Sequence, residues 1–149
     1  MLKLMYITNS PEVASIADGA GVDRIFIDLE RYGKEKRQKN WDSVKSKHSI
    51  SDIPKVKSAV KNAQIFVRTD PIFDGFSDEL EGVLACEPDV VMLPYFKTVR
   101  EVETFIKAVD GRATTSLLLE TREAAEQIDD IISVGGIDEI HIGLNDLSH

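Results

Sequence analysis

The stretch Ile25-Phe26-Ile27-Asp28-Leu29-Glu30 shows the pattern that decides the fold, a short apolar run that ends in charged residues. The same pattern returns in residues 65–68, 117–120 and 140–146. A short apolar run bounded by turn residues is typical of a strand that is buried on both faces of a parallel sheet. In a barrel of such strands the carboxyl ends converge on one face, where active sites are built. The pattern therefore predicts a shared site from the charges that end these runs, which include Arg68, Glu120 and Asp146.

Strand-like and helix-like segments alternate along the whole sequence, which predicts an α/β fold with a parallel sheet. Ser10 before Pro11 is a typical helix start, and Thr98 followed by Glu101 fits a capping box. We expect strands at residues 3–8, 24–29, 64–68, 90–94, 115–120 and 139–143. We expect helices at residues 11–19, 54–62, 78–85, 99–109 and 122–134.

The number of strand–helix units predicts an incomplete barrel. A TIM-type barrel has eight such units in about 250 residues, whereas this chain has 149 residues and about six units. We therefore expect residues 1–149 to form a single TIM-type (β/α) barrel domain that is truncated at the C-terminus. A six-stranded open sheet is the alternative. The polar stretch 31–53 is expected to be a long loop after the second strand, and such loops are usually functional or disordered.

Composition excludes several classes of function. The net charge of −8 is opposite to the basic face that nucleic-acid binding requires. The sequence has no apolar stretch that could cross a bilayer and no secretory signal pattern, and its single cysteine, Cys86, excludes an internal disulfide framework. We therefore expect a cytoplasmic protein without nucleic-acid or membrane partners. The basic segment 31–39 is either a solvated loop or a lip that attracts an anionic substrate.

Glu120 and Asp146 are the strongest candidates for metal ligands. Each follows an apolar run, and the 26 residues between them correspond to one strand–helix–strand step, so we expect them on adjacent strands. Hard divalent cations such as Mg²⁺ bind carboxylate oxygens and keep several waters, which leaves positions for a substrate. A 2-oxo acid could bind through its carboxylate and carbonyl oxygens, and the ion would stabilise an enolate. The alternative is that Glu120 only caps the following helix.

Other residues at the strand ends complete the predicted site. Arg68 could neutralise an enolate oxygen or hold a carboxylate, or it could form a structural ion pair with Asp28 or Glu30. Asp28 and Glu30 are two residues apart and share a face of the strand, from which Asp28 could assist proton transfer. Backbone N–H groups from Gly143 to Asn145 could hold a carboxylate. The histidines are expected to be structural or solvated; they are His48, His141 and His149.

Five stretches carry a resemblance to a known family. They are residues 26–30, 66–68, 91–94, 119–124 and 142–148. In this order they resemble the HpcH/HpaI aldolase and citrate lyase beta-subunit family, within the phosphoenolpyruvate/pyruvate-binding barrels. The resemblance implies an eight-stranded barrel, usually oligomeric, that binds Mg²⁺ or Mn²⁺ and forms or cleaves a carbon–carbon bond through a pyruvate-type enolate. It implies that Glu120 and Asp146 hold the metal and that Arg68 stabilises the enolate. It also implies that Asp28 and Glu30 are the acidic residues of the second strand.

Two positions depart from the pattern of the pyruvate aldolases in that family. Arg31 stands where they carry a histidine that assists proton transfer, and Leu118 stands where they carry a glutamine. We expect Arg31 to contact the substrate instead. The main prediction is a metal-dependent carbon–carbon lyase that acts on a 2-oxo acid. The alternatives are an acyl-CoA lyase or hydrolase, in which residues 31–39 receive a CoA phosphate, and a non-catalytic binding or assembly module.

Overall fold

A computed structural model describes residues 2–31 and 47–147 and shows six parallel strands in one sheet. The strands lie side by side in the order of the sequence, and each neighbouring pair is parallel. This sequential order is that of a β/α barrel, whereas a doubly wound sheet reverses its strand order. The parallel α/β fold is thereby confirmed. The strands are β1 (Met5–Ile7), β2 (Arg24–Asp28), β3 (Gln64–Arg68), β4 (Val90–Leu93), β5 (Thr114–Leu119) and β6 (Glu139–Ile142).

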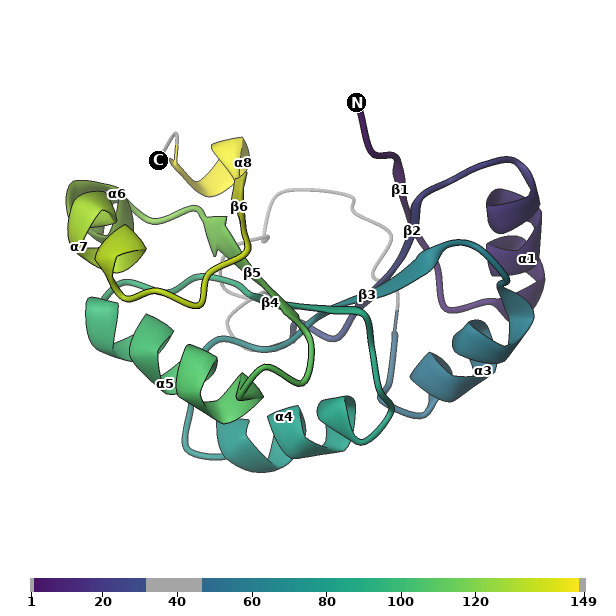
Figure 1. Ribbon diagram of the computed structural model, residues 1–149, viewed down its shortest axis with the longest axis horizontal. Coiled ribbons are helices and arrows are strands. Elements are labelled where there is room, and N and C mark those ends of the chain that lie inside the picture. Colours follow the sequence, from purple (N-terminus) through teal and green to yellow (C-terminus); the bar gives the residue numbers. More distant parts are fainter. Residues whose placement is uncertain (1, 32–46, 148–149) are drawn as a thin grey trace.

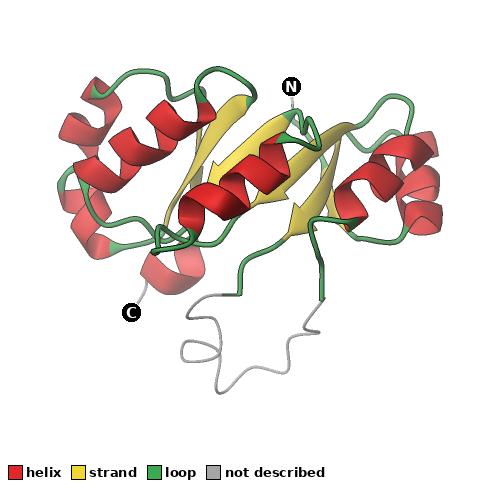
Figure 2. Cartoon of the chain, turned by 90° about the horizontal axis from the view of Figure 1, so that it is seen from below, coloured by secondary structure: helices red, strands yellow, loops and turns green. Residues whose placement is uncertain are grey.

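Helices cover the outer face of the sheet, which forms an arc in Figure 1. Seen at right angles to that view, the helices lie in front of the strands as a second layer (Figure 2). Within the described residues, no helix is long and apolar enough to cross a bilayer. The helices are α1 (Pro11–Gly19), α3 (Asp52–Ala59), α4 (Phe76–Leu84), α5 (Val99–Val109), α6 (Arg122–Glu126), α7 (Ile128–Ser133) and α8 (Leu144–Leu147).

Side chains from distant strands meet on the inner face because the sheet curls. Nη1 of Arg24 on β2 donates to Oε2 of Glu139 on β6 at 2.7 Å, although β2 and β6 are not neighbours in the sheet. The ring centroids of Phe66 on β3 and His141 on β6 are 5.7 Å apart. β1 and β6 are the two edges of the described sheet. The described residues therefore form a half-barrel and not a closed one.

The alternation of side chains along each strand divides the buried apolar residues into two clusters. The outer cluster lies between the sheet and the helices and includes Ile25, Ile27, Val67 and Phe105. The inner cluster, on the concave face, contains Phe26, Phe66, Val90 and Met92, with Leu118 packed against it. Full burial of one such side chain stabilises the fold by about 1.5–3 kcal/mol. Because both faces of the central strands β2, β3 and β4 are covered, these strands are nearly continuous apolar runs in the sequence.

The predicted starts of two helices are confirmed in atomic detail. The N–H of Val13 donates to Oγ of Ser10 at 3.3 Å, which caps α1 ahead of Pro11. At the start of α5, the side chains of Thr98 and Glu101 each accept the other's backbone N–H, so the capping box is formed. These local signals place the helices without any knowledge of tertiary contacts.

Other helix boundaries were predicted wrongly. α3 begins at Asp52 and not at Pro54. A helix tolerates proline in its first turn, because the backbone N–H groups there have no partner within the helix. The predicted loop 31–53 therefore ends at Ser51, and its residues 32–46 lie outside the described residues. α4 begins at Phe76, two residues before the predicted start.

The predicted helix at 122–134 is two helices, α6 and α7. Gln127 lies between them with φ −111° and ψ 18°, outside helical geometry. Its side-chain Nε2 donates to the carbonyl of Lys97 at 3.1 Å. This contact with a residue 30 positions away offsets the local preference for a continuous helix, and it could not be predicted from the periodicity of the segment.

Candidate active site

Four charged side chains lie at the carboxyl ends of three strands of the sheet, β2, β3 and β5. Asp28 ends β2, Arg68 ends β3 directly opposite it in the register, and Glu30 and Glu120 follow β2 and β5. The three carboxylate residues are only 7–8% exposed. Buried charges are costly unless they are paired or hold an ion, so their joint presence at this edge indicates a site. The sequence prediction that these residues come together is correct for all four.

Arg68 forms a two-point ion pair with Asp28. Its Nε donates to Oδ1 of Asp28 at 2.9 Å, and its Nη2 donates to Oδ2 at 2.8 Å. The same Nη2 lies 3.4 Å from Oε2 of Glu30, and the guanidinium stacks 5.5 Å from the centroid of the Phe26 ring. The structural ion pair that the sequence left as an alternative for Arg68 is therefore present. It holds the guanidinium in one orientation on the inner face.

Glu120 is a buried carboxyl in a negatively charged environment. Burial away from water, and then the charges of Glu30 and Asp146, raise its pKa from the ordinary 4.5 to about 7, although Arg68 partly offsets them. Its Oε1 accepts the backbone N–H of Tyr95 at 3.0 Å. The cap of α6 is not Glu120 but Thr121, whose Oγ1 accepts the N–H of Ala124.

The end of β6 approaches Glu120 closely at Gly143. A Cβ added to Gly143 would lie 2.8 Å from Cβ of Glu120 and 3.2 Å from its Oε2, so only glycine fits there. The N–H of Gly143 donates to the carbonyl of Leu119 at 2.9 Å. The strand ladder thus already uses this one of the N–H groups from Gly143 to Asn145, and binding of a substrate carboxylate by the segment stays a prediction. Asn145, on α8, is exposed, and its predicted contact with substrate stays a prediction.

The donor set at this edge fits a divalent cation. The negative charges of Glu30 and Asp146 act on Glu120, and Arg68 is the cation that opposes them. The pKa of Glu120 is raised first by burial and then by these negative charges, and a bound hard cation would favour its charged form. Among residues 2–31 and 47–147, no three His, Cys, Asp or Glu side chains are grouped as a complete metal site. Glu120 and Asp146 would therefore be two protein ligands, and water or substrate would supply the others.

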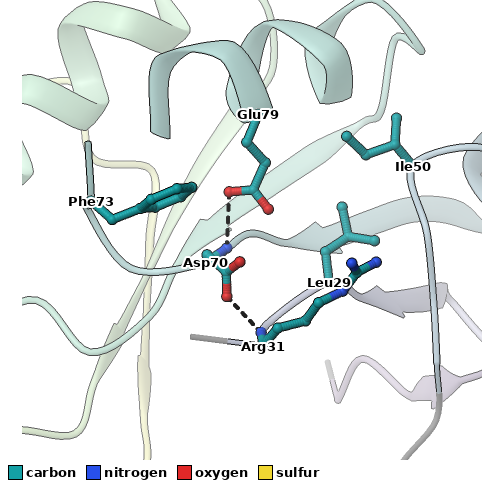
Figure 3. A pocket seen from close by; sticks show the side chains of 6 residues that line it. All are labelled: Leu29, Arg31, Ile50, Asp70, Phe73 and Glu79. Carbon is teal, nitrogen blue, oxygen red and sulfur yellow. Dashed lines mark hydrogen bonds between the residues drawn. The ribbon is translucent and has the colours of Figure 1, made fainter. Parts of the chain in front are cut away.

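Arg31 lies in a neighbouring pocket and not among these charges. Figure 3 shows its side chain beside Leu29 and Ile50, whereas its N–H donates to Oδ1 of Asp70 at 2.5 Å. Its Nη2 donates to the carbonyl of His48 at 2.9 Å. The pocket has a volume of about 210 Å³ and is lined by Leu29, Arg31, Ile50, Asp70, Phe73 and Glu79. The expected contact of Arg31 with a substrate at the metal site therefore has no support in the geometry.

His48 is a residue of the site region that sequence reasoning missed. Its ring is buried, and its Nδ1 accepts the backbone N–H of Asp28 at 2.9 Å. The bond fixes Nδ1 as the acceptor and the ring beside the end of β2. The expectation of a structural histidine is confirmed, although its partner, 20 residues away, has no local sequence signal. His141, 3.4 Å from Glu139, is also structural, and His149 lies outside the described residues.

Comparisons with known proteins agree with this geometry. The sequence model of the HpcH/HpaI aldolase/citrate lyase family matches residues 3–149. The curated proteins contain no match to the sequence. A family protein from Burkholderia cenocepacia J2315 has a similar structure, with a TM-score of 0.77 and 13% identity over 98% of this chain and 65% of its own.

Two further solved structures are similar in fold. The citrate synthase SbnG has a TM-score of 0.75 and 18% identity over 98% of this chain and 62% of its own. A citrate lyase from Burkholderia xenovorans LB400 has a TM-score of 0.70 and 16% identity over 99% of this chain and 50% of its own. The chain thus spans 50% to 65% of the length of these structures. With the family's sequence model matched from residue 3 to residue 149, the chain belongs to the HpcH/HpaI aldolase/citrate lyase family.

Proposed function

We propose that this chain carries the site of a divalent-metal-dependent carbon–carbon lyase, of the aldolase type, that acts on a 2-oxo acid such as pyruvate. The observation that supports it is the cluster of Arg68 with buried carboxylates at the carboxyl edge of the sheet. The family contains aldolases and lyases, and two structures of the same fold are a citrate synthase and a citrate lyase. Both names describe chemistry at a carbon–carbon bond.

Each residue has a role in the proposed reaction. Mg²⁺ or Mn²⁺ held by Glu120 and Asp146 would supply Lewis-acid stabilisation of the developing enolate. Arg68 donates hydrogen bonds to the substrate's oxygen atoms, and Asp28 keeps its guanidinium oriented through two bonds. Proton transfer requires a base near the reacting carbon, and we assign it to a water on the metal or to Asp28, which with Glu30 contacts Arg68.

The proposal extends to the architecture and setting of the enzyme. The sequential strand order and the curl of the sheet support an eight-stranded barrel as the complete fold. Apolar side chains are exposed at both edges of the half-barrel, where further strands would pack; they include Tyr6, Ile7, Ile140 and Ile142. We place the enzyme in the cytoplasm as a homo-oligomer, in keeping with the resemblance.

A second candidate is an acyl-CoA lyase or hydrolase. The pocket of Arg31 lies directly beside the site, because Arg31 follows Glu30 in the chain, and it could receive part of a longer thioester substrate. Calorimetric titration with CoA tests this candidate. Binding that Lys34→Glu with Lys36→Glu weakens would favour the thioester, and no binding at millimolar CoA would exclude it.

Exchange of the methyl protons of pyruvate with deuterated water tests the main proposal. Exchange followed by proton NMR in the presence of Mg²⁺ should require both the metal and Glu120. Glu120→Gln should abolish it, whereas Glu123→Gln, a matched change of an exposed glutamate three residues on, should leave it unchanged. Arg68→Lys should slow it about 10²-fold, because an ammonium cannot reproduce the two-point contact. A folded, metal-binding protein without exchange would contradict the assignment to pyruvate.

A further inference from the structure

The turn after β4 contains a strained residue beside the site. Tyr95 has φ +48°, in the left-handed region that side chains other than glycine rarely adopt. In the described residues two other non-glycine side chains share this conformation, Glu87 and Asp110, and both are exposed at helix ends. Tyr95 is half-buried and precedes the buried Phe96, so a helix end does not account for its conformation. Strain of this kind persists only where the surrounding contacts impose it.

The strained conformation directs a backbone donor at Glu120. The N–H of Tyr95 reaches Oε1 of Glu120 across 3.0 Å, between residues 25 positions apart. On the other side of the same carboxyl, the backbone of β6 at Gly143 lies so close that a Cβ would be 3.2 Å from Oε2. The carboxylate is thus held between the turn after β4 and the end of β6.

Three contacts hold the turn in place behind Tyr95. Oγ1 of Thr121, itself 4% exposed, donates to the carbonyl of Phe96 at 2.6 Å. The carbonyl of Lys97 accepts Nε2 of Gln127, and the N–H of Lys97 donates to Oε2 of Glu101 at 2.9 Å. Thr121 lies between β5 and α6, Gln127 lies between α6 and α7, and Glu101 lies on α5. These three side chains bond to two consecutive residues, Phe96 and Lys97. Because three separate contacts fix these residues, the turn can keep Tyr95 in its strained conformation.

We propose that the turn 95–97 is a positioning device for Glu120, with the N–H of Tyr95 as the contact and Thr121 as the main anchor. The device holds the carboxylate of Glu120 in one orientation, so that this side chain does not have to be ordered when Glu120 and Asp146 bind a metal. Its purpose rests on the proposed function, in which these two residues hold the metal, but the contact itself can be tested separately.

The sharpest test removes only the N–H. Replacement of Tyr95 by its α-hydroxy analogue puts an ester oxygen in place of the nitrogen and keeps the side chain. We expect the affinity for Mn²⁺, measured by electron paramagnetic resonance, to fall about tenfold. Loss of a partner that orients a metal ligand lowers metal affinity by about 10- to 100-fold, and the expected loss is at the lower end of that range. The matched control is the same exchange at Leu4, whose N–H donates to Oδ2 of Asp23 at 2.8 Å, at the amino ends of the strands and away from the turn. Affinity within twofold of the parent for the Tyr95 ester would overturn the proposal.

A pair of ordinary substitutions tests the anchor if the esters do not fold. Thr121→Val removes both the bond to Phe96 and the cap of α6, and Thr121→Ser keeps a hydroxyl for both. We expect Thr121→Val to weaken Mn²⁺ binding at least threefold and Thr121→Ser to restore it to within twofold. A purely structural role would lower the stability of Thr121→Val but leave its metal affinity unchanged, and that result would also overturn the proposal.

Hydrogen exchange of the Tyr95 amide separates failure of this proposal from failure of the proposed function. The amide should exchange at least tenfold faster in Glu120→Ala than in the parent, and at an unchanged rate in Glu126→Ala, which changes an exposed glutamate paired with Arg122. If the protein binds no Mn²⁺ but shows this difference, the turn holds Glu120 and the metal assignment is what fails. If the amide exchanges equally fast in the parent and in Glu120→Ala, the contact does not exist and the proposal is wrong.

Discussion

Two glutamates with the same raised pKa of about 7 show how much the neighbourhood of a residue decides. Glu79 and Glu120 both owe the shift first to burial and then to neighbouring carboxylates. Glu120 faces Glu30 and Asp146 inside the arc, whereas Glu79 faces Asp70 in the pocket of Figure 3 and accepts that residue's N–H at 3.3 Å. Neither shift could be inferred from sequence, because both depend on groups brought together by the fold.

Glu79→Gln should change how stability depends on pH. The folded state raises the pKa of Glu79 from 4.5 to about 7 through burial and Asp70, with Arg31 opposing, so the folded state binds its proton more tightly. The carboxyl therefore lowers the free energy of unfolding as pH rises from about 4.5 to about 7. We expect Glu79→Gln to gain stability relative to the parent across that window, in urea titrations at pH 5, 6, 7 and 8.

Glu81→Gln provides the control of opposite sign. The hydrogen bond from Arg112 lowers the pKa of Glu81, so its contribution is present above pH 4.5 and is lost as pH falls below it. Glu81→Gln should therefore lose a little stability at pH 7 and nothing at pH 3. A Glu79→Gln variant whose stability runs parallel to that of the parent from pH 5 to pH 8 would contradict the burial of Glu79.

At the scale of the elements, the starts of α1 and α5 were predictable and the break between α6 and α7 was not. A cap depends on residues three apart, so Ser10 and the pair Thr98 and Glu101 carry their own signal. Gln127 breaks its helix through a contact with Lys97, far away in sequence. The missed contacts at the site are of the same kind, since His48 and Tyr95 reach their partners from loops.

Thr98→Ala should destabilise the fold by about 1 kcal/mol, the usual cost of losing a helix cap. The substitution removes the acceptor for the N–H of Glu101 and opens the capping box of α5. Thermal and urea unfolding measure the change. Thr104→Ala is the matched control, because that hydroxyl donates to the carbonyl of Arg100 within the helix and caps nothing; its effect should stay within about 0.5 kcal/mol. Equal losses for both variants would argue against the capping box.

At the scale of the whole molecule, the curl of the sheet is what creates the site. Asp28 and Arg68 are direct neighbours in the register, but Glu120 follows β5 and comes near them only because the arc closes around its inner face. The ion pair of Arg24 and Glu139 spans the same arc from β2 to β6. Arg24 is 4% exposed and Glu139 is 26% exposed, so this pair is a partly buried connection between strands that are four positions apart in the sheet order.

Arg24→Met should lower the free energy of unfolding by about 3 kcal/mol, because it leaves Glu139 without its cation inside the arc. Addition of Glu139→Leu should recover a large part of that loss, since an apolar pair of similar volume is often as stable as a buried ion pair. Urea unfolding of both variants measures this recovery. Arg122→Met, which breaks an exposed pair with Glu126, should have little effect. A double variant as unstable as Arg24→Met alone would show that the loss does not come from the unpaired carboxylate of Glu139.

The sequence by itself determined the strands, most of the helices and the positions of Asp28, Glu30, Arg68 and Glu120 at strand ends. These follow from local periodicity and from the burial of parallel strands on both faces, which a single stretch of chain already expresses. Only the tertiary structure decided the partners: Arg68 with Asp28, Glu120 with Tyr95, and Arg31 in a separate pocket. Such contacts join residues 25 or 40 positions apart and depend on how the sheet curls, which no local pattern specifies.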